Sequence, residues 1–143
     1  MKESIKVFAP ATVANVGCGF DIMGFALDGI GEEIIITKTQ NGALNVKPVK
    51  GFENIPTDPE KNVATVAVKA MLDRLDLVQG FEFEFFKHIK PGSGLGTSAS
   101  SSAGAVYAVN ELLGRPFERK ELVEFAMEGE KLLSGKAHGD NVS

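Results

Sequence analysis

Residues 91–104 begin with three closely spaced glycines, Gly92, Gly94 and Gly96, and continue with a run of hydroxyl side chains. They lie between two segments of different hydrophobic period. Residues 81–86 alternate phenylalanine with glutamate, as in a half-buried strand. After the glycines, small and apolar side chains recur at helical spacing until Gly114, a common type of helix end. Glycines between a strand and a helix let main-chain N–H groups converge on an anion at the positive end of the helix. The order therefore predicts a strand, a phosphate-binding loop and a helix.

This loop differs from the two best-known phosphate loops. It lacks the Gly-Lys-Ser/Thr ending of a Walker A loop, and no Gly-x-Gly-x-x-Gly follows the first predicted strand. A tight strand-to-helix turn, in which the serines serve only as helix caps, is the alternative. The leading Pro91, the three glycines and the following Thr-Ser-Ala-Ser favour phosphate binding.

Composition narrows the class of protein. The chain has 143 residues, of which 43% are hydrophobic, so we expect one compact domain. A net charge of −4 and scattered basic residues argue against a nucleic-acid partner. No segment approaches the ~18 apolar residues that span a bilayer, so we expect no membrane association. Cys18 is the single cysteine and excludes an internal disulfide, so we expect a cytoplasmic protein.

Strand and turn signals occupy the first third of the chain. Residues 5–8 are typical of a short strand that ends at Pro10, and residues 33–39 predict a second, isoleucine-rich strand. Asn41-Gly42 is the signal for a two-residue hairpin turn. Residues 44–46 are therefore predicted to pair back on the isoleucine-rich strand.

Two further helices are expected, one on each side of the glycine-rich segment. Asp58 is the predicted cap of the first, with Pro59 at its first position. Its apolar stripe is Val63, Val66, Ala67, Ala70 and Met71. The other helix is expected from about residue 118 to residue 133. Its predicted buried side is Leu122, Phe125, Ala126, Leu132 and Leu133. Strands mixed with helices indicate an α+β or α/β architecture.

Two other polar clusters have a functional and a structural interpretation. Asn15 and Asp21 interrupt a small, apolar run, and by themselves such residues are more often turn formers. Glu130 precedes a turn that contains His138, Asp140 and Asn141. One carboxylate near a phosphate site is a natural Mg²⁺ ligand, whereas a solvated helix face with a capping turn is the simpler interpretation of this segment alone.

Taken together, these segments resemble a known family. The pattern Pro-x-x-Gly-Leu-Gly-Thr-Ser-Ala of residues 91–99 resembles the second signature of the GHMP kinases, the galactose, homoserine, mevalonate and phosphomevalonate kinase group. Residues 9–24 look like the amino-terminal segment of homoserine kinases, and residues 138–142 resemble their His-x-Asp-Asn-Val segment. The resemblance implies an α+β fold of the ribosomal protein S5 domain 2-like type, with a mixed sheet and helices on one side.

The same resemblance implies an activity: phosphorylation of the L-homoserine hydroxyl by ATP with Mg²⁺, giving O-phospho-L-homoserine for threonine biosynthesis. The positions that match ATP-binding residues are Asn62, Pro91, Gly92, Ser93, Gly94, Leu95, Gly96, Thr97, Ser98, Ala99, Ser100 and Ser101. Those that match substrate-binding residues are Asn15, Asp21, His138 and Asn141. Ser98 and Glu130 match the Mg²⁺ ligands, so the resemblance implies that they act in catalysis. It also suggests that the reaction can proceed without a dedicated base, and Asp140 is the candidate in this chain if one is needed.

The resemblance also implies that residues 1–143 form the amino-terminal ATP-binding domain and that a carboxy-terminal domain is absent from this chain. We then expect weak nucleotide binding, no turnover by the chain alone, and an exposed apolar interface that favours self-association, as in a homodimer. Two alternatives stay open. One is a kinase for another small alcohol such as mevalonate, and the other is a non-catalytic nucleotide-binding module.

Overall fold

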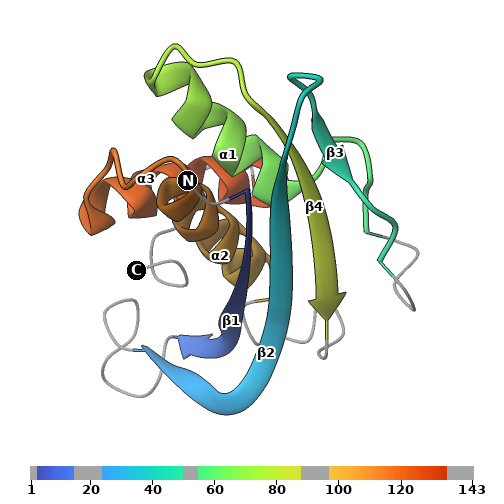
Figure 1. Ribbon diagram of the computed structural model, residues 1–143. Helices are drawn as coiled ribbons and strands as arrows, with labels where there is room; N and C mark the ends of the chain where they lie inside the picture. The colour runs from blue at the N-terminus through green and yellow to red at the C-terminus, as the bar shows by residue number, and fades with distance from the viewer. Residues whose placement is uncertain (1–2, 15–23, 50–54, 88–96, 135–143) are drawn as a thin grey trace.

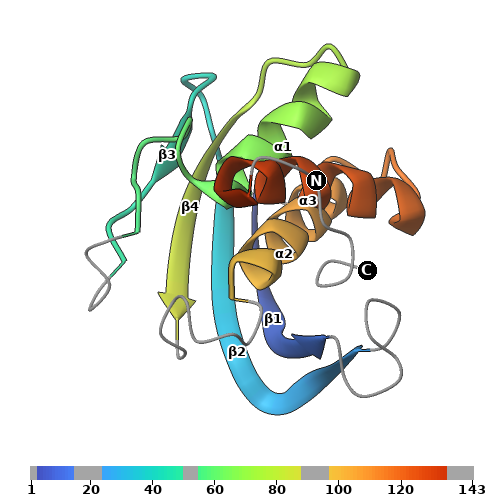
Figure 2. The same cartoon turned by 180° about the vertical axis from the view of Figure 1, so that it is seen from behind.

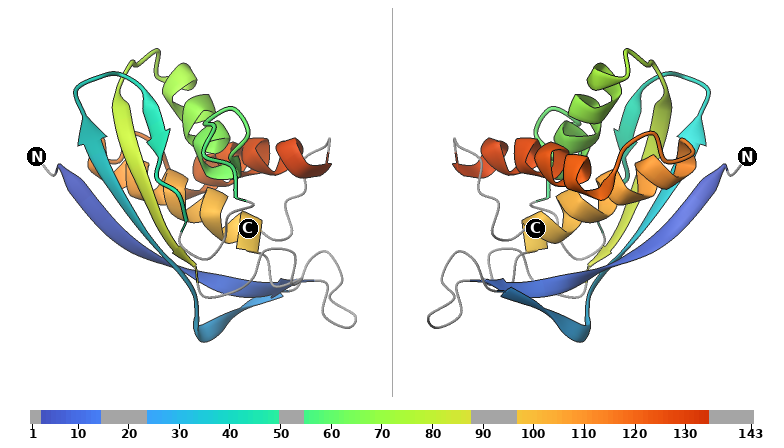
Figure 3. Two further views of the ribbon diagram at one scale, coloured as in Figure 1. Left: turned by 90° about the vertical axis from the view of Figure 1, so that its right-hand side faces the viewer. Right: turned by 90° about the vertical axis from the view of Figure 1, so that its left-hand side faces the viewer.

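The computed structural model describes residues 3–14, 24–49, 55–87 and 97–134, which form a four-stranded sheet and three helices (Figure 1). The strands are β1 (Ser4–Ala14), β2 (Gly24–Thr39), β3 (Leu44–Val46) and β4 (Gly80–Lys87). The helices are α1 (Val63–Arg74), α2 (Thr97–Leu112) and α3 (Arg119–Ser134). All three helices cover one face of the sheet (Figures 2 and 3). The predicted α+β fold, a mixed sheet with helices on one side, is confirmed.

Strand β1 continues through Pro10, so the prediction that it ends there is wrong. Its residues from Ser4 to Ala14 pair antiparallel with β2, with a register shift between Pro10 and Thr12. β1 lies at the edge of the sheet, where proline is tolerated, and the register shift absorbs the irregularity. β1 and β2 therefore reach beyond the rest of the sheet and curve away from it (Figure 3).

The predicted hairpin between β2 and β3 is also wrong. β3 pairs in parallel with β4, and β4 lies between β3 and β2 in the order β1-β2-β4-β3. Gly42 has φ +70°, but Asn41 is not in the positive-φ region that a type I′ turn requires. The Asn41 side chain instead accepts a hydrogen bond from Ala43 N at 3.0 Å, which turns the chain away from β2. The phenylalanine-rich β4 thereby gains neighbours on both edges.

The core lies between the sheet and the helices. Alternate side chains of the two central strands point towards the helices and are buried: Ile34, Ile36, Phe81, Phe83 and Phe85. Helix α2 packs against β1, β2, α1 and α3, which explains why its side chains are small or apolar on nearly every side. Asn110 of α2 bonds both main-chain groups of Phe117, so it also fixes the connection to α3.

The start of α1 differs from the prediction. Asn62, not Asp58, is the N-cap, because its side chain accepts from Ala64 N and Thr65 N at 2.9 and 3.4 Å. Asp58 instead caps a separate turn through Glu60 N. The shift changes the buried stripe, which consists of Ala64, Thr65, Ala67, Val68, Met71 and Leu72. Val63, Val66 and Ala70 are only half-buried.

Helix α3 begins at Arg119 and ends at Ser134, close to the predicted limits. Leu122, Phe125 and Ala126 are buried as expected, but Leu132 is 41% exposed, so its prediction as a core residue is wrong. Leu133 and the expected stop at Gly135 lie outside the described side chains.

The face of the sheet away from the helices is partly open. Phe8 and Phe86 are 49% and 42% exposed there, and the strand register places both opposite Glu33. Lys47 forms ion pairs with Glu82 and Glu84 at 3.4 and 3.3 Å on the same face. The hydrogen bond from Lys47 to Glu84 is the main cause that raises the pKa of this lysine. Such exposed pairs contribute little to stability.

Gly129 lets α3 approach the start of α1 and the first turns of α2. A Cβ atom at this position would collide with the main-chain oxygen of Val63 and would lie 2.7 Å from Ser102 Oγ and 3.2 Å from Ala67 Cβ. A main-chain oxygen inside a helix cannot move aside as a flexible side chain can. Glycine at this position is therefore required by the packing of the three helices.

We predict that Gly129→Ala destabilises the protein, although alanine is the better helix former. The collision with Val63 costs about 1–3 kcal/mol, more than the ~1 kcal/mol that helix propensity returns. Urea unfolding followed by circular dichroism measures the difference. Glu124→Ala, an exposed change in the same helix, is the control and should stay within about 0.5 kcal/mol of the parent. Equal stability of the two variants would contradict the packing argument.

Candidate functional site

The candidate site lies where β4 ends and α2 begins. β4 ends at Lys87, and α2 starts at Thr97, which confirms the predicted succession of strand and helix on either side of the glycine-rich segment. The first main-chain N–H groups of a helix have no partner inside it, and the helix dipole adds positive potential at this end. The first turn of α2 contains no acidic side chain that would oppose an anion. The amino end of α2 is therefore suited to receive phosphate.

Two consecutive serines attach α2 to the sheet. Ser100 Oγ donates to the main-chain oxygen of Pro10 in β1 at 2.8 Å, and Ser101 Oγ donates to Glu32 Oε1 in β2 at 2.6 Å. Both side chains and that of Ala99 are buried. These hydroxyl groups thus bond to the protein, and a contact of these residues with ATP stays a prediction.

Glu32 and Lys87 form a buried ion pair beside Ser101, and sequence reasoning missed both residues. Lys87 Nζ lies 2.8 Å from Glu32 Oε2 and 2.7 Å from Ser101 Oγ. The two charged side chains are only 4% and 8% exposed. The two-residue alternation of the strands could have revealed this pair, because Glu32 lies on the same face as Ile34 and Lys87 lies on the same face as Phe85.

Gly129, the neighbour of Glu130 in α3, approaches Ser102 of α2 closely. Ser102 follows Ser98 by one helical turn in the sequence, so α3 packs against α2 in the turn after Ser98. Glu130 is half-buried, and its Oε1 atom is buried. Within the described residues, no group of three or more His, Cys, Asp or Glu side chains could hold a metal ion. A Mg²⁺ site needs fewer, since one or two carboxylates suffice when phosphates complete the shell.

Asn62 is 5% exposed and serves the fold as the cap of α1. In addition to the two bonds it accepts, its Nδ2 donates to Pro56 O at 3.0 Å. The cap lies next to Val63, whose main-chain oxygen faces Gly129. The helix-capping role accounts for this buried amide without a ligand, and the role of Asn62 in binding ATP stays a prediction.

The other predicted site residues lie outside the part that the structure describes. These are Asn15, Asp21, Pro91, Gly92, Ser93, Gly94, Leu95, Gly96, His138, Asp140 and Asn141, together with the side chains of Thr97 and Ser98.

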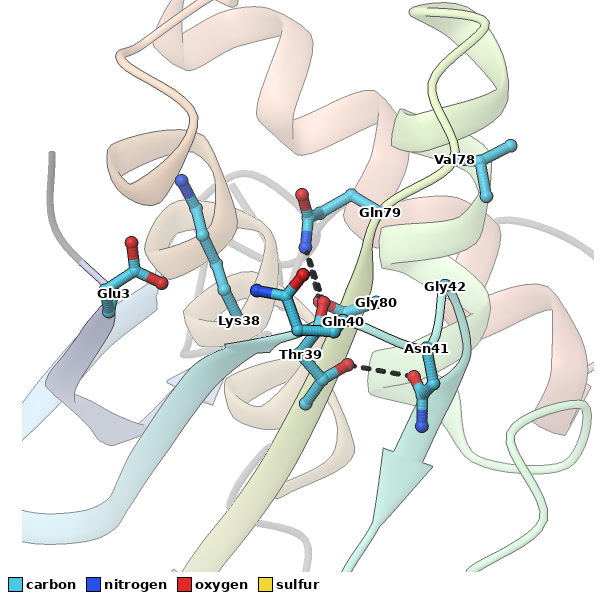
Figure 4. Close-up of a pocket in the computed structure, with 9 residues that line it drawn as sticks. All are labelled: Glu3, Lys38, Thr39, Gln40, Asn41, Gly42, Val78, Gln79 and Gly80. Carbon is cyan, nitrogen blue, oxygen red and sulfur yellow. Dashed lines mark hydrogen bonds between the residues drawn. The ribbon is translucent and has the colours of Figure 1, made fainter.

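A polar pocket of about 530 Å³ lies at the other end of β4 (Figure 4). Its lining includes the end of β2, Asn41, Gln79 and Gly80. Gln79 Nε2 donates to the main-chain oxygens of Thr39 and Gly80 at 3.1 and 2.9 Å, so its amide is used to join the two strands. The eight residues of β4 separate this pocket from Lys87 by roughly 20 Å. It is therefore distinct from the candidate site.

Comparison with known families agrees with this geometry. Residues 62–143, more than half of the chain, match the family described as the GHMP kinases N terminal domain. The matched region includes Asn62, both sides of the glycine-rich segment and Glu130. The chain therefore belongs to the GHMP kinase family and carries the fold of its amino-terminal domain. Within the described residues, none of the helices has the length and hydropathy to cross a membrane.

Several proteins similar to this chain are homoserine kinases. The chain is 40% identical to a homoserine kinase of Chlorobium phaeovibrioides and 39% identical to one of Methanococcus maripaludis, in each case over 99% of this chain. A crystal structure of homoserine kinase from Cytophaga hutchinsonii superposes with a TM-score of 0.92 at 48% identity and covers 99% of this chain. The chain spans 48%, 47% and 45% of the lengths of these three proteins, which is about half. A mevalonate kinase of Methanococcus jannaschii, with a TM-score of 0.75 at 22% identity, shares the fold.

We predict that Asn62→Ala lowers the free energy of unfolding by about 1 kcal/mol, because Ala64 N and Thr65 N lose their cap. Asn62→Asp should lose less stability, since a carboxylate also accepts from both N–H groups at the positive helix end, although it no longer donates to Pro56 O. Asp58→Ala is the matched control, because its bond to Glu60 N is exposed and precedes the helix. Thermal and urea unfolding measure the effects. Equal losses of stability in Asn62→Ala and Asp58→Ala would contradict the larger contribution that we assign to Asn62 as the cap of α1.

Proposed function

We propose that this chain is the amino-terminal, ATP-binding domain of a kinase that phosphorylates the side-chain hydroxyl of L-homoserine. The observation that carries the proposal is the similarity to homoserine kinases along 99% of the chain, at about 40% identity. The packing of α2, with its amino end at the candidate site, supports the phosphate-binding part. The relation to mevalonate kinases supports only the fold.

Residues 91–101 are proposed to bind the triphosphate of ATP. Phosphoryl transfer needs little covalent help, because catalysis consists mainly of holding donor and acceptor in line and stabilising negative charge. Main-chain N–H groups at the start of α2 can provide that stabilisation without reorganising. The bonds of Ser100 and Ser101 to the sheet hold this helix end in place.

Ser98 and Glu130 are proposed to hold the Mg²⁺ that accompanies ATP. Their chemistry fits the ion, which prefers oxygen ligands and commonly takes one or two carboxylates together with phosphate oxygens. The place of Glu130 on the helix that Gly129 packs against α2 supports this assignment. Bound Mg²⁺ would neutralise charge on the phosphates.

Homoserine binding is assigned to Asn15, Asp21, His138 and Asn141 on the motifs alone. The Asp21 carboxylate suits the substrate ammonium group, and their attraction increases where water is excluded. Asp140 is the proposed base if the hydroxyl proton does not pass directly to the phosphate. O-phospho-L-homoserine is the product, and we place the reaction in threonine biosynthesis in the cytoplasm. A chain with one cysteine suits that reducing compartment.

The substrate proposal is tested by ADP release from the kinase of which this chain is proposed to be the amino-terminal domain, with ATP, Mg²⁺ and each of homoserine, mevalonate, shikimate and galactose. We expect turnover with homoserine to exceed turnover with the other alcohols. Preference for a different alcohol would refute the substrate. Binding of a non-hydrolysable ATP analogue in calorimetry, without turnover of any alcohol, would favour a nucleotide-binding module instead.

The proposed division of roles predicts different kinetics for three variants of the whole kinase that would contain this chain. Ser98→Ala and Glu130→Gln should lower kcat and shift its dependence on Mg²⁺ concentration, because each removes an oxygen ligand. Asp21→Asn should mainly raise KM for homoserine, because it removes the partner of the ammonium group. Steady-state kinetics at several Mg²⁺ concentrations measure both. Equal loss of ATP affinity in all three would contradict these roles.

A further inference from the structure

We propose that Glu32, Lys87 and Ser101 are positioning residues that hold the amino end of α2 in the orientation that nucleotide binding needs. The inference rests on the proposed function, since it assumes that this helix end receives the triphosphate. It concerns residues that act through the helix and need not touch the ligand.

The three side chains form a closed ring of hydrogen bonds. Lys87 Nζ donates to Glu32 Oε2 at 2.8 Å and to Ser101 Oγ at 2.7 Å, and Ser101 Oγ donates to Glu32 Oε1 at 2.6 Å. Each carboxylate oxygen thus accepts from a different donor. Lys87 Nζ also lies 5.7 Å from the centre of the Phe85 ring, where a cation interacts favourably with the aromatic face. The ring joins three elements, β2, β4 and α2.

The register of the sheet creates this arrangement. Glu32 pairs directly with Lys87 across the antiparallel strands β2 and β4. Both side chains point to the helix-covered face, as do Ile34 and Phe85 on the same strands. Opposite charges therefore meet beneath the first turns of α2, where the next described residues on the same face, Ile34 and Phe85, are apolar.

Stability alone is a poor explanation for such a group. Removing two charges from water costs about as much as their attraction returns, and apolar replacements of a buried pair are often neutral or stabilising. The directional bonds provide something that apolar packing does not, namely a defined distance and rotation between groups. A positioning role accounts for charged groups that stability does not require.

Ser101 connects the ring of hydrogen bonds to helix α2. Its neighbour Ser100 bonds to Pro10 O in β1, so consecutive residues attach the same turn of α2 to strands on both sides. Two attachments fix both the rotation of the helix about its axis and its distance from the sheet. The N–H groups that lack a partner inside the helix lie in its first turn, so a small rotation of α2 redirects those groups.

A simple charge effect makes a different prediction, which allows a test. If the pair acted on the triphosphate only through its field, removing the negative charge with Glu32→Gln would tighten binding, whereas Lys87→Met would weaken it. A positioning role predicts weaker binding in both. It also predicts weaker binding in the double variant Glu32→Gln/Lys87→Met, in which the net charge is the same as in the parent and no unpaired charge is buried.

The experiment measures the affinity of the chain for a non-hydrolysable ATP analogue with Mg²⁺ by calorimetry, and its stability by urea unfolding. We expect about 10- to 100-fold weaker binding in Glu32→Gln, Lys87→Met and the double variant, the size of effect that small misplacements of binding groups produce. The double variant should unfold at nearly the same urea concentration as the parent. Lys47→Met, which breaks exposed pairs on the other face of the sheet, is the control and should bind as the parent does.

The outcomes separate the two proposals. Parent-like affinity in the folded double variant, or tighter binding in Glu32→Gln, would overturn the positioning role while the proposed function stands. Absence of binding by the parent chain itself would overturn the proposed function, and the inference with it. Weaker binding in all three variants, with normal binding in Lys47→Met, would support the positioning role.

Discussion

Helix α2 is packed against the sheet on one side and against α1 and α3 on the others, and this burial determines both the core and the candidate site. Such close packing requires small side chains. A Cβ on Gly104 would lie 2.7 Å from Ile34 Cδ1, and one on Gly129 of α3 would lie 2.7 Å from Ser102 Oγ. A helix held this tightly presents its amino end at a constant place, at the end of the sheet where β4 stops. Stability of the core and presentation of N–H groups therefore have the same cause.

The polar groups around α2 complement this apolar packing. Ser100, Ser101 and Asn110 use their side chains to join the helix to β1, β2 and the connection to α3. The ion pair of Glu32 and Lys87 adds directional bonds close to the helix start. A GHMP kinase carries out a reaction in which positioning and electrostatic stabilisation matter more than covalent catalysis. A rigid, well-oriented helix end is what such chemistry requires from the protein.

Local features were predictable and long-range pairing was not. The limits of α2 and α3 follow from spacing and from glycine at position 114, whose φ of +85° matches the expected helix end. The partner of β3 could not be derived, because a turn signal at residues 41–42 reports only local geometry, while β4 enters the sheet from farther along the chain. The cap of α1 was misplaced for a related reason. Asp58 and Asn62 are both good caps, and tertiary packing selected Asn62.

For the candidate site, the sequence alone was enough to locate the glycine-rich segment, to predict the helix after it and to indicate the family, since these depend on short patterns of residues. The motif residues 15, 21, 91–96, 138, 140 and 141 remain predictions from those patterns. Only the tertiary structure brought Gly129, the neighbour of Glu130, against the second turn of α2, and only the register of β2 with β4 joined Glu32 to Lys87. Both contacts join residues far apart in the chain. No local pattern specifies them, because they arise from how the elements pack.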